Sequence, residues 1–171
     1  MKSNEKFASL ILIVFALISC QKDIAITPQQ QVENALDQFA ASLVSNPPTA
    51  ANASARVKQY MQTIAVPPQY FYGATVTLLD TMGVAKYSPY WYRSGDSLRT
   101  LDLAADTTYL INSQPWLRQP IDNGGPIWTA PYFDAGGGNI WMKTRSVPIK
   151  VNGKIIAVAT TDLPIWMRMV I

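Results

Sequence analysis

The feature that does most to limit how this chain folds is a dipeptide near its C-terminus, Asn152-Gly153, which joins two β-rich runs. The runs are IWMKTRSVPIKV (140–151) and KIIAVATTDL (154–163). A type I′ turn needs positive φ at both of its central positions, and asparagine followed by glycine adopts this conformation at the least cost. The sequence therefore predicts a β-hairpin over 140–163, which places the C-terminal part of the chain in an antiparallel sheet.

Shorter segments before the hairpin are also rich in aromatic and β-branched residues, as strands are. We expect strands within residues 70–80, 82–93 and 127–133, and the short segment 97–103 is left open as a further one. Between the last two segments the pattern has no clean period. Here we expect a short helix at about 106–112 and then a loop that contains Pro115, Trp116 and Pro120. The sheet would then have about five strands.

Helices are expected before the sheet. Apolar residues recur with helical spacing between residues 28 and 45, which predicts an amphipathic helix; they are Val32, Leu36, Phe39 and Leu43. The pair Thr27-Pro28 suits its first turn, with a capping side chain followed by proline. A second helix is expected at about 50–64. Helices followed by antiparallel strands predict a single α+β domain over 28–171.

The first 27 residues are expected to lie outside this domain. Lys2 and Lys6 precede the apolar run FASLILIVFALIS, which is the layout of a secretory signal peptide over residues 1–19. The four residues that end at Cys20 resemble the lipobox of bacterial lipoproteins, which implies cleavage before Cys20, acylation of its thiol and a lipidated tether over 20–27. A signal peptide that happens to end near a cysteine is the alternative.

Composition excludes several kinds of chemistry. The chain has no histidine and one cysteine, which removes His-based acid–base catalysis, His metal sites and an internal disulfide. Its net charge is only +3, without basic runs, so no nucleic-acid partner is expected. Asp134 and Asp162 are a weak signal for a catalytic carboxylate pair. We therefore expect no enzyme activity, no cofactor and no metal.

A run of motifs in fixed order resembles the Cache domain, an extracytoplasmic sensory module with a PAS-like antiparallel sheet. The motifs include FYGATVTLLD, YSPYWYR and PWL, then WTAPYFD followed by glycines, MKTRSVPI and GKIIAVATTDL, and they span about Tyr70–Asp162. The resemblance implies a PAS-like fold that is carried by N-terminal helices. It also implies a small-molecule ligand and a membrane signalling partner.

Amino-acid-binding Cache domains share a spaced set of side chains that hold the two charges of the ligand. The resemblance maps four of them onto this chain as ligand-binding candidates: Tyr109, Trp116, Tyr132 and Asp162. It implies that Asp162 neutralises an ammonium group. Gln114 stands where the family has the carboxylate-binding arginine, and Leu117 where it has a tyrosine. The expected ligand is therefore a small polar or amine-bearing molecule. A core-packing role for the three aromatic residues is the alternative.

These observations favour a lipid-anchored, non-catalytic sensor in the cell envelope. It would bind a small molecule and present it to a membrane receptor, or modulate that receptor. Two alternatives remain at this point. One is an interaction or scaffold protein on a Cache-like fold with a decayed pocket, which Gln114 and Leu117 favour. The other is the sensor portion of a longer receptor that is cut by a stop codon. The apolar residues 163–171 are too few to span a membrane, which favours the free-standing module.

Overall fold

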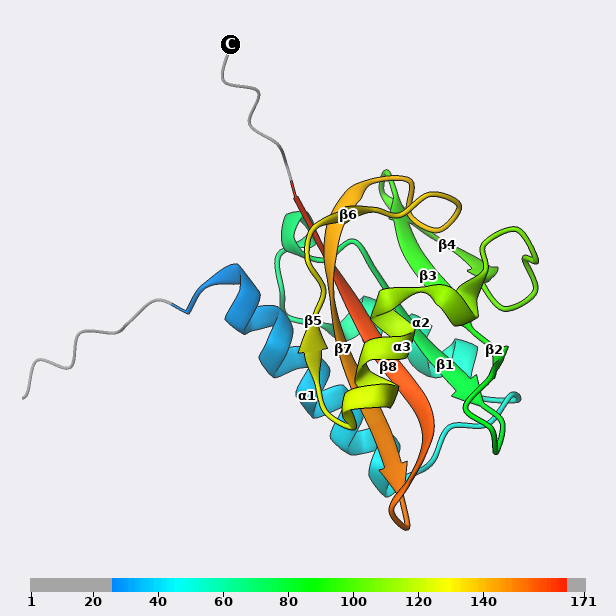
Figure 1. Ribbon diagram of the computed structural model, residues 1–171. Helices are drawn as coiled ribbons and strands as arrows, with labels where there is room; N and C mark the ends of the chain where they lie inside the picture. Colours follow the sequence, from blue (N-terminus) through cyan, green and yellow to red (C-terminus); the bar gives the residue numbers. More distant parts are fainter. Residues whose placement is uncertain (1–25, 166–171) are drawn as a thin grey trace, which may run out of the picture.

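The computed structural model describes residues 26–165 and confirms the predicted α+β class (Figure 1). Two helices come first in the chain and a third comes midway: α1 (Pro28–Ser45), α2 (Ala53–Thr63) and α3 (Pro115–Asn123). Two single-turn 3₁₀ helices are η1 (Pro68–Tyr70) and η2 (Ile111–Ser113). The predicted signal peptide and Cys20 lie outside the described residues. No helix within 26–165 is both long enough and apolar enough to cross a bilayer.

The sheet has eight antiparallel strands, more than the five or so expected, because several are only two or three residues long. The strands are β1 (Gly73–Leu79), β2 (Ala85–Tyr87), β3 (Pro89–Ser94), β4 (Ser97–Asp102), β5 (Ile127–Trp128), β6 (Tyr132–Phe133), β7 (Trp141–Val151) and β8 (Lys154–Pro164). Their main order is β4-β3-β1-β8-β7-β5, with β2 paired to β1 and β6 paired to β7.

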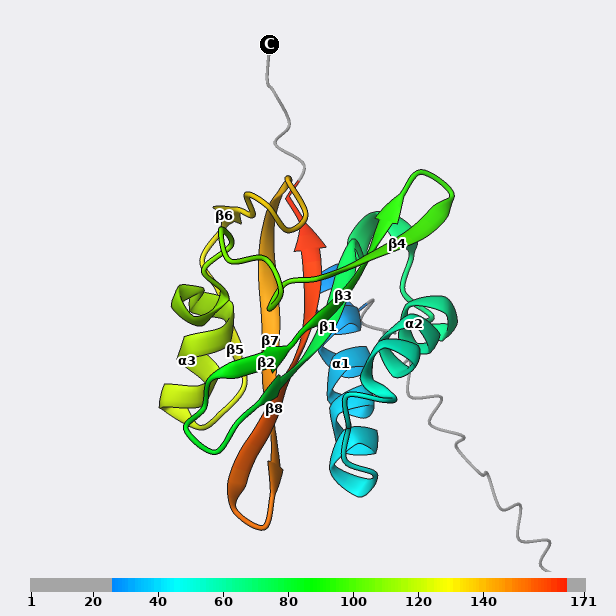
Figure 2. The same ribbon diagram turned by 90° about the vertical axis from the view of Figure 1, so that its right-hand side faces the viewer.

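The sheet is the middle layer of three. In Figure 2 helices α1 and α2 cover one face, whereas α3 covers the other. Each face has its own apolar core. The core under α1 and α2 includes Phe71, Val76 and Ile149, and the core under α3 includes Leu117 and Val158. The functional site described below lies on the α3 face.

The predicted hairpin is present. Strands β7 and β8 are joined by Asn152 and Gly153, whose φ angles are +50° and +78°. Both values are positive, as the type I′ geometry requires. The two strands are the longest of the sheet, and β8 lies near its centre, between β1 and β7. Helices α1 and α3 pack on this hairpin, whereas α2 packs on β1 and β3.

The start of α1 also agrees with the sequence. Thr27 accepts a hydrogen bond from the backbone N–H of Gln30, whose side chain accepts one from the backbone of Thr27, a complete capping box. The buried face of α1 carries Val32, Leu36, Ala40 and Leu43. Phe39 is only half-buried and stacks on Tyr60 of α2, with ring centroids 4.3 Å apart.

One local prediction was wrong. The helix expected at about 106–112 is a series of turns ending in η2, and α3 occupies the segment expected to be a loop. The prolines explain the difference. Pro115 is in the first turn of α3, where proline is favoured because its missing N–H needs no partner. Pro120 lies inside the helix; it costs a hydrogen bond, which packing of α3 on the sheet offsets.

Candidate functional site

The four residues expected to bind a ligand all lie on the α3 side of the sheet. Trp116 is on α3, Tyr109 precedes η2, Tyr132 is on β6, and Asp162 is near the end of β8. The Trp116 indole N–H donates to the Tyr109 hydroxyl over 3.1 Å. Tyr132 is joined to Asp162 through the hydroxyl of Thr144, with both distances 2.8 Å. The structure therefore gathers these residues into two hydrogen-bonded groups.

Asp162 is a buried carboxylate, only 4% exposed. The Thr144 hydroxyl donates to its Oδ1 and the Tyr90 hydroxyl donates to its Oδ2, both over 2.8 Å. Burial, and next the negative charge of Asp134, raise the pKa of Asp162 to about 7, although the two hydrogen bonds lower it. This carboxyl group therefore titrates near neutral pH.

Asp134 is a second buried carboxylate in the same site. The Tyr109 hydroxyl donates to its Oδ1 and the backbone N–H of Gly138 donates to its Oδ2, both over 2.7 Å. A Cβ atom at Gly137 would lie 2.1 Å from Asp134 Oδ2. The glycine run is therefore needed to bring the loop backbone against the carboxylate.

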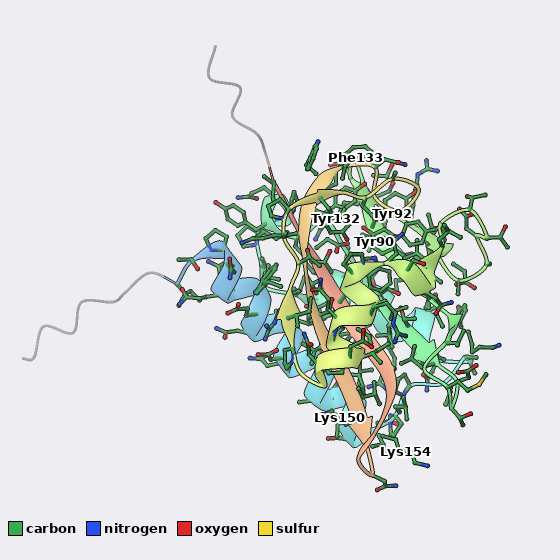
Figure 3. The ribbon with its side chains drawn as sticks, in the orientation of Figure 1. Tyr90, Tyr92, Tyr132, Phe133, Lys150 and Lys154 are labelled. Carbon is green, nitrogen blue, oxygen red and sulfur yellow. The ribbon has the colours of Figure 1, made fainter. Side chains whose placement is uncertain are left out.

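Tyr90 reaches Asp162 from β3 by lying across a glycine. A Cβ atom at Gly73 would be 2.4 Å from the Tyr90 hydroxyl, so only glycine leaves room for the ring. The ring also stacks on Tyr92, with centroids 5.6 Å apart. Figure 3 shows Tyr90 and Tyr92 at the same end of the sheet as Tyr132. We call this assembly the acidic cluster; it comprises Tyr90, Tyr109, Trp116, Tyr132, Asp134, Thr144 and Asp162.

The tyrosines of the acidic cluster remain neutral hydrogen-bonding groups. Burial raises the pKa values of Tyr90, Tyr109 and Tyr132, and the nearby carboxylates raise them further. Sequence analysis missed Tyr90 and Thr144 and gave Asp134 no binding role. The spacing of Tyr90 and Tyr92, which places both on one face of a strand, was the available signal for the first of these.

No lysine or arginine in the described part of the chain pairs with either carboxylate. Within residues 26–165 neither Asp134 nor Asp162 forms an ion pair. Arg118 of α3 pairs instead with an exposed carboxylate of its own helix. Lys150 and Lys154 lie at the opposite end of the sheet from Tyr90 and Tyr132 (Figure 3). The acidic cluster is therefore a largely desolvated acidic site that has no ion-pair partner among the described residues.

The two positions that depart from the amino-acid-binding pattern both have structural roles. The Gln114 side-chain N–H donates to the backbone carbonyl of Tyr109 over 2.8 Å. Leu117 is fully buried in the core beneath α3. Neither side chain is free to bind a ligand carboxylate.

Two open grooves lie on the other side of the sheet. A groove of about 830 Å³ runs between α1 and α2 and is lined by Phe39, Tyr60 and several amide side chains. Another of about 630 Å³ lies beside α2 and β4 and includes Lys58 and Trp91. Neither includes a residue of the acidic cluster. The two grooves with the recorded volumes thus lie on the face covered by α1 and α2. The buried unpaired carboxylates, which cost more free energy to maintain, lie on the face covered by α3.

Comparison with known families agrees with this arrangement. The sequence profile of the methyl-accepting chemotaxis protein-like first PDC sensor domain matches residues 54–166. The chain belongs to this family. PDC domains are Cache-type sensor domains, so the resemblance drawn from the motifs is confirmed. The match includes the whole sheet and every residue of the acidic cluster.

Solved structures support the same fold. The extracellular domain of the histidine kinase soHK1S-Z6 is 26% identical with a TM-score of 0.63, and the match covers 80% of this chain and 53% of that one. The ligand-binding domain of the Campylobacter jejuni chemoreceptor Tlp3 with L-valine is 19% identical, with a TM-score of 0.55 and coverages of 80% and 55%. That of the Pseudomonas aeruginosa amino acid chemoreceptor PctC with GABA is 20% identical, with a TM-score of 0.57 and coverages of 80% and 57%.

This PDC domain thus spans little more than half the length of the sensor domains it matches. No match was found among proteins with curated descriptions. At 19–20% identity the chemoreceptor structures establish the fold and not the ligand.

Proposed function

We propose that this PDC domain is an extracytoplasmic sensor that binds a small, positively charged amine in the acidic cluster. The observation that carries the proposal is the pair of buried carboxylates, Asp134 and Asp162, which have no ion-pair partner among the described residues. Buried charges are normally paired, because an isolated one is costly. An ammonium group would supply the missing positive charge.

The surrounding side chains suit an ammonium group as well. Its three N–H donors need acceptors, and carboxylate oxygens form the strongest such bonds. Tyr109, Tyr132 and Trp116 add ring faces, which attract cations. The four residues mapped from the family, Asp162 with these three, are therefore proposed as ligand contacts, with Asp134 added to them.

The ligand is proposed to be an amine that needs no carboxylate for recognition. PctC and Tlp3 were solved with GABA and L-valine, which carry both groups. Here Gln114 is bonded to the Tyr109 carbonyl and Leu117 is buried. Arg118 is paired on its own helix. A carboxylate clamp of the bidentate arginine type is therefore not available from these positions.

A thermal-shift screen of the purified full chain tests this proposal. We expect linear primary amines to raise the melting temperature and the matching alcohols and carboxylates to leave it unchanged. At ten times its Kd a ligand adds about 1.4 kcal/mol to the free energy of unfolding. A carboxylate that stabilises the chain more than its matched amine would contradict the proposal.

The second candidate is a non-catalytic interaction or scaffold protein whose pocket has decayed. Gln114 and Leu117 both have structural roles, which favours this candidate. Asp162 favours it as well, because its two oxygens already accept hydrogen bonds from Thr144 and Tyr90. A stable, folded chain that no small molecule stabilises at millimolar concentration would select this candidate over the sensor.

We also propose a lipid anchor. Removal of residues 1–19 and acylation of Cys20 would hold the domain at the envelope surface, close to a membrane signalling partner that reads the ligand-bound state. Labelled palmitate added to an expressing bacterium is expected to enter the full chain and not the Cys20→Ser variant. Label that persists in the variant, or a full chain recovered unlabelled, would contradict the anchor.

A further inference from the structure

The acidic cluster continues along the sheet as a second row of buried hydroxyl groups. Thr144 and Asp162 are directly opposite each other on β7 and β8, and the next pair on the same face is Ser146 and Thr160. Side chains two residues apart in a strand point to the same side, so Ser146 faces α3 as Thr144 does. Ser146 and Thr160 are 0% and 2% exposed.

The Ser146 hydroxyl differs from the Thr144 hydroxyl in having no partner. Its Oγ is buried and makes no hydrogen bond to any residue that the structure describes. Thr144, by contrast, bonds both Tyr132 and Asp162. A buried hydroxyl without a partner loses its bonds to water and gains nothing in return. A ligand group that bonds Ser146 would remove this cost.

Apolar side chains of α3 lie on the same face of the sheet as Thr144 and Ser146 (Figure 2). Trp116 and Leu117 of α3 are both buried and belong to the core on this face. This face of the sheet therefore carries the buried carboxylates at one position and an unpartnered hydroxyl one residue pair further along β7 and β8. At about 3.3 Å per residue, Thr144 and Ser146 are separated by about 7 Å along β7. A chain of about four or five carbons between two polar groups covers that length.

We propose that Ser146 forms a second subsite and that the ligand is an amine with an uncharged polar group, a hydroxyl or an amide, at the other end of a short carbon chain. This inference rests on the proposed function, because the amine end is held by Asp162 and Asp134. A second ammonium is disfavoured at Ser146, since one neutral hydroxyl does not balance a buried charge.

Calorimetric titration of the purified full chain with pentylamine and aminopentanol tests the second subsite. Aminopentanol is expected to bind about tenfold more tightly, because its hydroxyl bonds Ser146. In the Ser146→Ala variant this advantage should disappear, while pentylamine binds at least as well as before. Ser45→Ala, which removes an exposed serine hydroxyl at the end of α1, is the matched control and should retain the advantage.

The two proposals fail in different ways. If neither compound nor any other primary amine binds, the proposed function and the Ser146 subsite both fall. If pentylamine binds but aminopentanol has no advantage on the unmodified chain, only the subsite is overturned, and no variant is needed for that result. If aminopentanol still binds more tightly than pentylamine in the Ser146→Ala variant, the subsite is also overturned, because the hydroxyl of aminopentanol then bonds another residue.

Discussion

Asp162→Asn is expected to weaken the binding of a primary amine by at least about a hundredfold, because breaking a buried charge pair costs about 3–5 kcal/mol. The same change should stabilise the ligand-free chain at pH 8. Asp162 is buried beside the negative charge of Asp134, and its raised pKa means that folding disfavours its ionised form. Asparagine has nearly the same shape and carries no charge, so it removes the repulsion and keeps the packing. Its amide oxygen accepts one of the two hydroxyl hydrogen bonds, and its NH2 group donates to the oxygen of the other hydroxyl.

This opposite movement of affinity and stability separates a binding role from a structural one. A purely structural aspartate would lower the melting temperature when it is replaced. The matched control is Asp122→Asn, which removes an exposed carboxylate of α3 and should change neither quantity by much. Titration calorimetry and thermal unfolding at pH 8 give both values. An Asp162→Asn chain that is less stable and binds amines as before would contradict the assignment.

The local elements could be predicted because each depends on a few neighbouring residues. Asn152 and Gly153 determine the turn of the central hairpin, since both adopt positive φ. Thr27 and Gln30 close the capping box that begins α1. In these places the energetic preference is local, so a short stretch of sequence contains the information.

The segment around α3 could not be predicted in this way. Pro115 and Pro120 are only five residues apart, a pattern that usually ends a helix. In the structure Pro115 begins the helix, the helix packs on β7 and β8, and Trp116 and Leu117 are buried in the core on this face. The sheet surface that stabilises α3 is built from residues far away in the sequence, and periodicity within the segment does not reveal it.

The acidic cluster could likewise be predicted only in part from the sequence. Family resemblance supplied four of its positions, and the structure brings all four to one end of the sheet. The nearness of Asp134 and Asp162 arises from the fold, because one follows β6 and the other is on β8. The contact of Tyr90 with Asp162 depends on the absence of a side chain at Gly73. The burial of Ser146 without a hydrogen-bond partner likewise arises only in the folded sheet.

Amine affinity is expected to fall about thirtyfold between pH 8 and pH 5.5, because the pKa of Asp162 lies at about 7 and only its ionised form attracts an ammonium. A primary amine stays protonated across this range, as lysine does. The carboxylates with lowered pKa values, Asp80 and Asp106, titrate well below this window. The change in affinity between the two pH values is therefore assigned to Asp162.

The stability of the ligand-free chain should move the other way. The folded chain holds the Asp162 proton up to about pH 7, whereas the unfolded chain loses it near pH 4. Between these values the folded state binds more protons, so the Asp162 contribution to the free energy of unfolding decreases as pH rises and is most favourable at about pH 4 and below. Asp162→Asn should flatten both the affinity and the stability profile above pH 5. A pH-independent amine affinity in the unmodified chain would place the ammonium away from Asp162.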